Sequence, residues 1–352
     1  MRKLQLAVVV LVLIAFSSPD AIGQFNRKSI RKNNKRISNF RGKKTGFDKS
    51  KKYNSIGISL NALNYYGDIA PRPSKLSTDI SFTRPAIGVS FAHRFGPRYT
   101  VQAQFMFGTL KASDNKSADK NDLESGIFRY QRNLSFRNQI KELSVVAVFD
   151  LFENESTYLG RVAWTPYAFL GVAGFINNPE AQAPATDLSG QPLPEAGKWV
   201  KLRPLGTEGQ YSKNLDPTDV NYGIKPYKVA QIAIPFGLGI RLKLTQVLDF
   251  WADLGFRYTF TDYLDDVSKN YVGLDKLNSP LAQAMSYRTN ELPGYPTNAV
   301  SSGIAGVNVQ AGYGSEHPDN LRGSKNDRDI YMVTSFKITY ILGATFHKAK
   351  FR

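Results

Sequence analysis

Apolar and polar side chains alternate strictly along two neighbouring stretches of the chain, residues 232–244 and 248–260. An alternation with a period of two puts all the apolar side chains on one face of a β-strand. Each stretch keeps its phase for about 13 residues, whereas a strand in a soluble β-sandwich averages about five or six. A tilted strand that crosses a membrane needs about 9–11 residues. The length of the alternation therefore favours a transmembrane barrel over a soluble sandwich.

The polar face of these two stretches carries charged residues separated by glycines. The charged residues are Arg241, Lys243, Asp249, Asp253 and Arg257, and the glycines are Gly237, Gly239 and Gly255. A hydrated or salt-bridged barrel interior tolerates such charges, and glycine leaves room for larger interior neighbours. Because lipid cannot satisfy the backbone of an open sheet edge, strands of this kind must close into a barrel.

Weaker copies of the alternation occur at 55–62, 87–92, 100–107, 142–150, 166–175 and 334–342. The links are short or modest at 96–98, 152–162 and 245–246, and long at 64–83, 111–136, 177–227 and 262–328. Outer-membrane barrels have short periplasmic turns and long extracellular loops. The pattern predicts an all-β fold, an eight-stranded antiparallel transmembrane outer-membrane β-barrel with long extracellular loops and both termini in the periplasm. The loops 177–227 and 262–328 are long enough to cap it.

A targeting segment precedes the predicted barrel. Arg2 and Lys3 come before an apolar run over 4–16, and the small-residue pattern Ala21-Ile22-Gly23 follows. This order is typical of a secretory signal peptide, here residues 1–23. The alternative is an N-terminal membrane anchor, for which the apolar run is short.

Residues 24–52 form a basic arm between the signal peptide and the barrel domain, 53–352. Its basic residues include Arg27, Lys28, Arg31, Lys32, Lys35, Arg36, Arg41, Lys43 and Lys44. One interpretation is a disordered, solvated periplasmic tail. The other is a docking peptide for acidic protein surfaces, anionic lipid head groups or peptidoglycan carboxylates. Because the chain is expected to be exported, a nucleic-acid partner is not expected.

The sequence offers little material for catalysis. It contains no Cys and three His, so there is no cysteine nucleophile and no thiolate metal site. Asp262, Asp265 and Asp266 cluster at one strand end, with His317 in the same link. They could form a cation site or an acid/base group. We favour turn residues that bind loop backbone or lipopolysaccharide-bound cations, and we expect no cofactor, no metal, no catalytic residue and no small-molecule substrate.

Four segments resemble a known family. They are 64–69, 95–99, 138–144 and the run Tyr-Thr-Phe-Thr-Asp-Tyr-Leu-Asp-Asp-Val at 258–267. They resemble small Bacteroidota outer-membrane barrels that include the PorG-type component of the type IX secretion system, and the resemblance covers about 53–347. Its family-like loop motif comprises Asp262, Tyr263, Asp265 and Asp266. The chain departs from this family by its basic arm and two very long loops.

The resemblance implies a non-enzymatic subunit of a protein secretion complex. Its expected partners are outer-membrane lipid and lipopolysaccharide, together with periplasmic or outer-membrane components of the complex. The alternative is a small passive porin or ligand-uptake barrel. Eight-stranded barrels are normally filled by their own side chains, which argues against conduction.

Overall fold

The computed structural model describes residues 47, 51–69, 82–123, 126–324 and 328–342. The predicted signal peptide and all but the last residues of the basic arm lie outside this range. Apart from Phe47, the described residues belong to one compact unit, residues 49–352.

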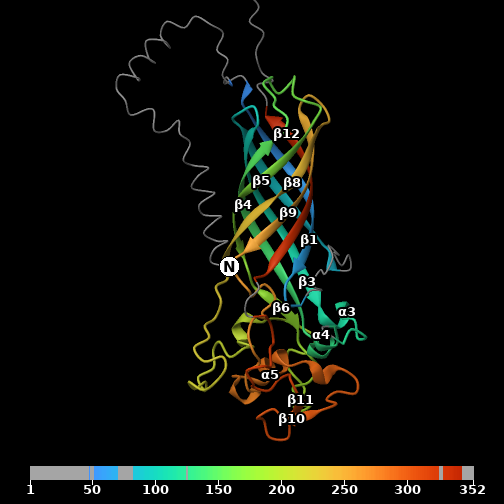
Figure 1. Cartoon of the computed structure of the whole chain (residues 1–352), viewed down its shortest axis with the longest axis vertical. Coiled ribbons are helices and arrows are strands. Elements are labelled where there is room, and N and C mark those ends of the chain that lie inside the picture. The colour runs from blue at the N-terminus through green and yellow to red at the C-terminus, as the bar shows by residue number, and fades with distance from the viewer. Residues whose placement is uncertain (1–46, 48–50, 70–81, 124–125, 325–327, 343–352) are drawn as a thin grey trace, which may run out of the picture. The chain divides into compact units, whose positions relative to one another are not determined.

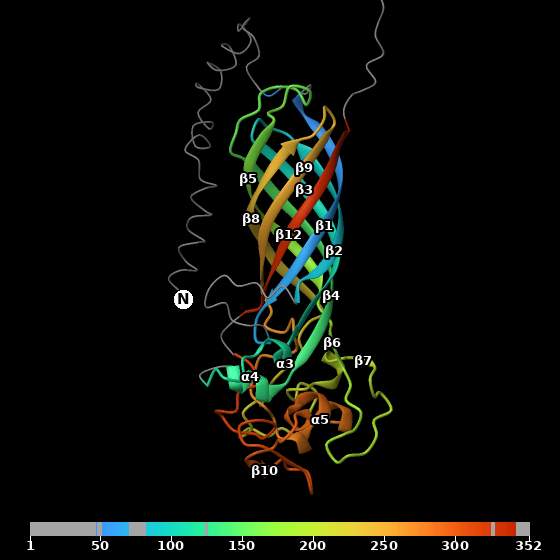
Figure 2. The ribbon, with the colours of Figure 1, turned by 90° about the vertical axis from the view of Figure 1, so that its right-hand side faces the viewer.

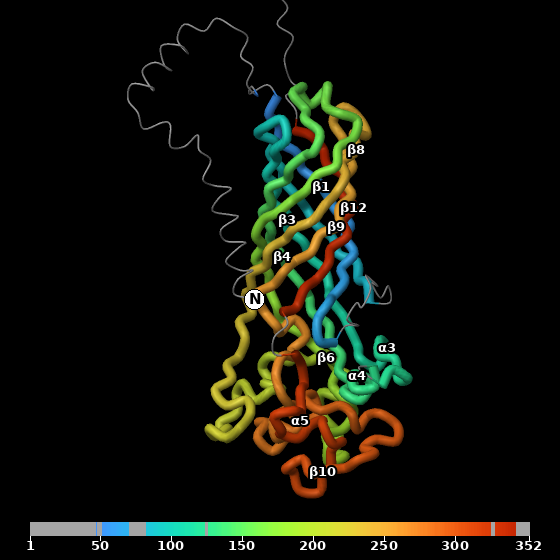
Figure 3. The backbone as a smooth tube through the Cα atoms, viewed as in Figure 1, coloured from blue at the N-terminus to red at the C-terminus, as the bar shows by residue number. Residues whose placement is uncertain are grey.

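Within the described residues, eight long antiparallel strands close into a barrel (Figures 1 and 2). They are β1 (Tyr53–Tyr66), β2 (Arg84–Arg94), β3 (Tyr99–Ser113), β4 (Ser135–Asp150), β5 (Trp164–Ile176), β8 (Ala230–Lys243), β9 (Leu248–Thr259) and β12 (Ile330–Leu342). Each strand pairs with the next of these in the chain, and β12 pairs with β1 to close the ring. The strands run obliquely around the barrel (Figure 3). The predicted eight-stranded antiparallel barrel is confirmed.

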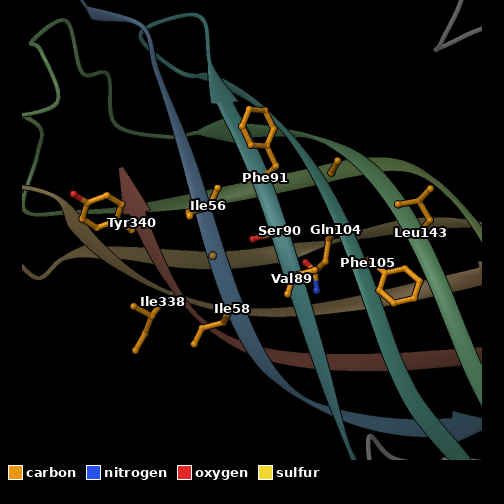
Figure 4. Close-up of a pocket in the computed structure, with 12 residues that line it drawn as sticks. Ile56, Ile58, Val89, Ser90, Phe91, Gln104, Phe105, Leu143, Ile338 and Tyr340 are labelled. Atoms are coloured by element: carbon orange, nitrogen blue, oxygen red, sulfur yellow. The ribbon is translucent and has the colours of Figure 1, made fainter. Parts of the chain in front are cut away.

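The outward face of the barrel is apolar on every strand. Leu238 is 69% exposed and Ile58 is 68% exposed, although both are large hydrophobic side chains. We call this surface the apolar belt; its representatives, one from each strand, are Ile58, Val89, Phe105, Leu143, Leu170, Leu238, Leu254 and Ile338. In Figure 4, Val89, Phe105 and Leu143 project from neighbouring strands of the belt. An apolar band around a closed barrel is the lipid-facing surface of a transmembrane protein.

The inward face is polar and fills the lumen. Glu142 on β4 accepts hydrogen bonds from Arg257 at 3.3 Å and from the Tyr331 hydroxyl at 2.5 Å. Nearer the short turns, Asp150 lies between Arg94 and Arg241 and pairs with both. A cavity inside the barrel, among Gln104, Tyr167 and Arg257, has a volume of about 20 Å³, which is room for about one water molecule.

Two of the predicted interior glycines make space for aromatic rings. A Cβ atom on Gly239 would lie 2.4 Å from the ring of Tyr167, and one on Gly255 would lie 2.5 Å from the ring of Phe169. Both rings are buried in the lumen. The glycines on β8 and β9 therefore let β5 fill the barrel with bulky side chains.

A buried arginine joins two connections at the end of the barrel where the short turns lie. The guanidinium of Arg161, from the link between β4 and β5, is buried and pairs with Asp249 at 2.7 Å. It also donates hydrogen bonds to the backbone carbonyls of Thr245, Gln246 and Leu248. One side chain thus joins the β4–β5 link to the β8–β9 turn.

The long links fold together at the opposite end into a structure that we call the cap (Figure 1). Its elements are α3 (Asp114–Ser117), α4 (Gly126–Arg132), β6 (Pro179–Gln182), β7 (Trp199–Lys201), η5 (Arg203–Leu205), η6 (Leu274–Lys276), α5 (Pro280–Ser286), η7 (Thr289–Glu291), β10 (Ala299–Ser301) and β11 (Asn308–Gln310). The cap has its own apolar core around Tyr271, Leu274, Tyr287 and Val309. These elements are too short to produce a periodic sequence pattern, so the sequence did not reveal them.

Among the described residues, no helix has the length and apolar character needed to span a membrane.

The apolar belt predicts a depth-dependent response to charge. Leu238 lies at the middle of β8, whereas Leu244 follows its end and is also exposed. Arg at position 238 should lower the free energy of unfolding from lipid vesicles by about 2–4 kcal/mol, and Arg at position 244 by about 0–1 kcal/mol. Urea titration followed by heat-modifiable gel mobility measures both. Equal tolerance of L238R and L244R would contradict a lipid-facing belt.

Candidate functional site

An apolar plug separates the lumen from the cap. It contains Leu63 on β1, Ile140 on β4 and Phe175 on β5, which are buried against Leu264 and Val267 of the 260–329 link. The family-like motif therefore begins inside the barrel mouth and continues into the cap. Its three aspartates lie at the boundary between these two regions.

The four long links are numbered in chain order: the first joins β1 to β2, the second β3 to β4, the third β5 to β8 and the fourth β9 to β12. Asp265 is fully buried and fastens the motif to the first link. Its carboxyl group accepts hydrogen bonds from the backbone N–H groups of Ile69 at 3.2 Å and Val267 at 3.0 Å. The hydroxyl of Tyr65 lies 2.8 Å from Asp265 and 2.6 Å from Asp329. That hydroxyl has one proton to donate, so the second contact requires a proton on one of the carboxyl groups. Burial raises the pKa of both aspartates well above the ordinary range, in agreement with a shared proton.

Asp266 fastens the motif to the third link. It accepts hydrogen bonds from the hydroxyl groups of Thr207 at 2.5 Å and Tyr227 at 2.7 Å. Burial raises the pKa of Asp266 to about 6, opposed by the nearby positive charge of Arg322. A backbone with positive φ, 70°, turns the chain at this residue.

Glu208 provides a second contact between the same two links. It accepts hydrogen bonds from the backbone N–H of Ser268 at 2.9 Å, from the hydroxyl of Tyr263 at 3.1 Å and from Arg322 at 3.1 Å. Asp262 accepts a 2.6 Å hydrogen bond from the Ser268 hydroxyl. Burial raises the pKa of Asp262 to about 8.

The second link joins through the buried pair of Asp114 and Arg132. The Arg132 guanidinium lies 2.8 Å from the Asp114 carboxylate and donates to the backbone carbonyls of Asp68 and Arg322. One arginine thus contacts the first and fourth links at the same time. All four long links meet in one largely buried polar network, which we call the cap hub: Tyr65, Asp114, Arg132, Glu208, Asp262, Tyr263, Asp265, Asp266, Arg322 and Asp329.

The cap hub contains all four residues of the family-like motif, Asp262, Tyr263, Asp265 and Asp266. Their contacts are tyrosine, threonine and serine hydroxyls, the Glu208 carboxylate, loop backbone and arginine. Within the part of the chain that the structure describes, no group of three or more His, Asp or Glu side chains is placed to hold a metal ion. His317 lies elsewhere in the same link, largely exposed and 3.5 Å from Asp319.

Sequence reasoning missed the partners of the motif. Tyr65 lies in the family-like segment 64–69, which was a usable signal, but Glu208 and Arg322 lie in stretches with no periodic pattern. The predicted docking residues of the basic arm, from Arg27 to Lys44, lie outside the described residues, so docking stays a prediction.

The concave surfaces outside the lumen are open. One of about 630 Å³ lies on the apolar belt among Ile58, Val89 and Phe105 (Figure 4). One of about 500 Å³ lies in the cap between Phe128 on α4 and Tyr313. The first faces lipid, so it can accommodate acyl chains.

The raised carboxyl pKa values predict a pH-dependent cap. A carboxyl group whose pKa is higher in the folded state stabilises that state below its unfolded pKa, about 4, and loses this contribution as the pH rises through the folded value. For Asp262 the loss therefore falls between about pH 4 and the folded pKa of about 8. Protease cleavage within 262–328 should be faster at pH 9 than at pH 5. Asp262→Asn, a neutral side chain of the same shape, should reduce this pH dependence.

Asp319→Asn, at a position 89% exposed in the same link, is the matched control. Because protease activity itself varies with pH, each variant is compared with the wild-type chain at the same pH. An unchanged ratio of D262N to wild type at both pH values would show that Asp262 does not govern the cap.

The chain matches one family model over part of its length and is distantly similar to solved outer-membrane barrels. Residues 45–185 match a family model described as a domain of unknown function (DUF6089). No curated protein matches. Among solved structures, the N-terminal β-barrel domain of Pseudomonas aeruginosa OprF is 9% identical, with 82% of this chain and 98% of that chain covered and a TM-score of 0.31. Neisserial surface protein A is 7% identical, with 82% and 96% covered and a TM-score of 0.32.

The outer membrane protein OprG of Pseudomonas aeruginosa is 12% identical, with 83% and 97% covered and a TM-score of 0.34. Similarity at this level carries no argument about function. The fold class rests on the closed strand pairing and the apolar belt of the chain itself.

Proposed function

We propose that this chain is a non-enzymatic outer-membrane β-barrel that serves as a subunit of a protein secretion complex, as its resemblance to the PorG-type type IX component implies. The observation that carries the proposal is the filled lumen, with a cavity of about 20 Å³. A barrel closed by its own side chains offers no path to a solute. The protein then acts through its outer surfaces and through the partners bound to them.

The proposed orientation places the cap outside the cell. Tyr53, at the start of β1, pairs with Arg94, and Leu342, at the end of β12, pairs with Asn54. Both ends of the barrel sheet therefore lie at the short-turn end. Short turns are periplasmic in outer-membrane barrels, which supports both termini in the periplasm.

The proposed role of the basic arm follows from that orientation. Residues 27–52 precede β1, so they would be presented on the periplasmic side. They contain 12 basic residues against a single acid, Asp48. Such a density of charge attracts acidic partners, although the attraction is screened over about 8 Å at physiological salt. We therefore propose that the arm docks a periplasmic component of the complex.

Labelling of introduced cysteines tests the orientation in this Cys-free chain. Ser189 and Asn298 lie exposed in the cap, and Gln246 lies exposed in the β8–β9 turn. Ser189 is preferred to Gly190, because Gly190 has a φ of 82° that a cysteine would strain. A membrane-impermeant maleimide applied to intact cells should label S189C and N298C and leave Q246C unlabelled. The reverse pattern would invert the proposed orientation.

Co-purification from cross-linked envelopes tests the secretion role and the arm. The full chain should retain periplasmic partners, and deletion of 27–52 or reversal of Arg31, Lys32, Lys35 and Arg36 to Glu should release them. The barrel itself should remain inserted, because the arm lies outside its strands. A variant with the residues of 27–52 in scrambled order keeps the charge and separates charge from sequence.

Two outcomes would count against these proposals. Full retention of partners and cargo secretion by the deletion variant would make the arm a solvated tail. Steady single-channel conductance in planar bilayers, with no protein partner captured, would favour the passive porin instead.

A further inference from the structure

Basic side chains gather on the outward face of the barrel just beyond the apolar belt, at its cap end. Along β3 and β4 the outward row runs from Phe105 opposite Leu143, through Phe107 opposite Lys141, to Lys111 opposite Arg137. The surface therefore changes from apolar to cationic within a few residues of each strand.

The short strands β6 and β7 extend this row sideways. Glu180 on β6 pairs with Arg137 on β4, and Lys201 on β7 pairs with Glu180. Lys116, in α3, is exposed and follows the end of β3, five residues beyond Lys111. We call this set the basic rim: Lys111, Lys116, Arg137, Lys141 and Lys201.

Trp199 and Glu180 hold the centre of the basic rim in place. The Arg137 guanidinium lies 3.8 Å from the centre of the Trp199 ring and donates two hydrogen bonds, of 2.9 and 3.0 Å, to Glu180. The Lys111 ammonium lies 6.0 Å from the same ring. Arg137 thus has a carboxylate partner, whereas Lys141 and Lys201 are exposed and point outward.

The basic rim adjoins concave surface on the apolar belt. A concavity of about 600 Å³ is lined by Leu60, Ile87 and Phe107. Lys141 on β4 lies directly opposite Phe107, one of the lining residues. Lys111 lies four residues further along β3, a distance of about 13 Å along an extended strand. Acyl chains in the concavity would bring a head group to the basic rim.

We propose that the basic rim binds the phosphate groups of a glycolipid whose acyl chains lie on the apolar belt of β1, β2 and β3. Continuity with the lipid-facing surface favours a lipid over a soluble anion, and clustered positive charge favours a phosphorylated head group. Arg137, Lys141 and Lys111 supply donors at successive heights, and Trp199 provides the interfacial aromatic ring. The inference deepens the proposed orientation, because it places the rim in the outer leaflet.

Native mass spectrometry of the full-length barrel in detergent tests the proposal with lipid A as the probe. Wild-type chain should bind lipid A roughly 100-fold more tightly than lipid A from which phosphatase has removed both phosphates. The triple variant Lys111→Gln, Lys141→Gln and Lys201→Gln should lose a similar factor. It retains Arg137, so Glu180 keeps its partner.

The matched control changes three exposed lysines of the cap, Lys213→Gln, Lys225→Gln and Lys228→Gln, and should bind as wild type. If the triple rim variant fails to fold, Lys201→Gln alone, outside the barrel strands, should still weaken binding roughly fivefold. Equal binding of the dephosphorylated lipid, or an equal loss in the control, would overturn the proposal. Unchanged lipid A binding by the rim variant would also overturn it. If that variant instead lost acidic envelope proteins, the rim would be a protein-docking surface.

The secretion role can fail in the envelope experiment without affecting this measurement, since lipid A binding needs only the purified chain.

Discussion

Every backbone N–H and C=O group within a bilayer must find its hydrogen-bond partner inside the protein. In this chain the requirement is met by the last seam of the barrel, where β12 pairs along its whole length with β1 from Asn54 to Tyr66. Closure gives every strand one face toward lipid and one toward a narrow lumen. The apolar belt, the paired interior charges and the small interior glycines all follow from that single condition.

Closing the barrel buries its interior, so an unpaired charge there is energetically unfavourable. A buried ion whose partner is removed is strongly destabilising, so interior charges such as Arg257 and Asp150 occur with partners of opposite sign. The lumen is consequently filled by side chains that hold one another. Because the lumen is filled, the surfaces that remain for a function are the two ends of the barrel and the basic rim.

The sequence predicts the barrel far better than the cap hub. Strands such as β8 and β9 can be recognised from local sequence, because successive side chains of a strand face alternately lipid and lumen. Asp265 and Glu208 have no such pattern, since their partners lie in other links and are selected by tertiary packing. The clustered aspartates at 262–266 marked the place of the hub, but the contact of Asp265 and Asp329 with the same Tyr65 hydroxyl required coordinates.

Arg161 ties the β4–β5 link to the β8–β9 turn without touching any residue named in the cap hub. The two ends of the barrel are therefore held by separate sets of residues. The paired charges of the lumen, such as Arg257 with Glu142, likewise belong to barrel strands alone. Substitutions in the long links remove none of these contacts, so the cap can vary in sequence while the strands keep the side chains that fill the lumen.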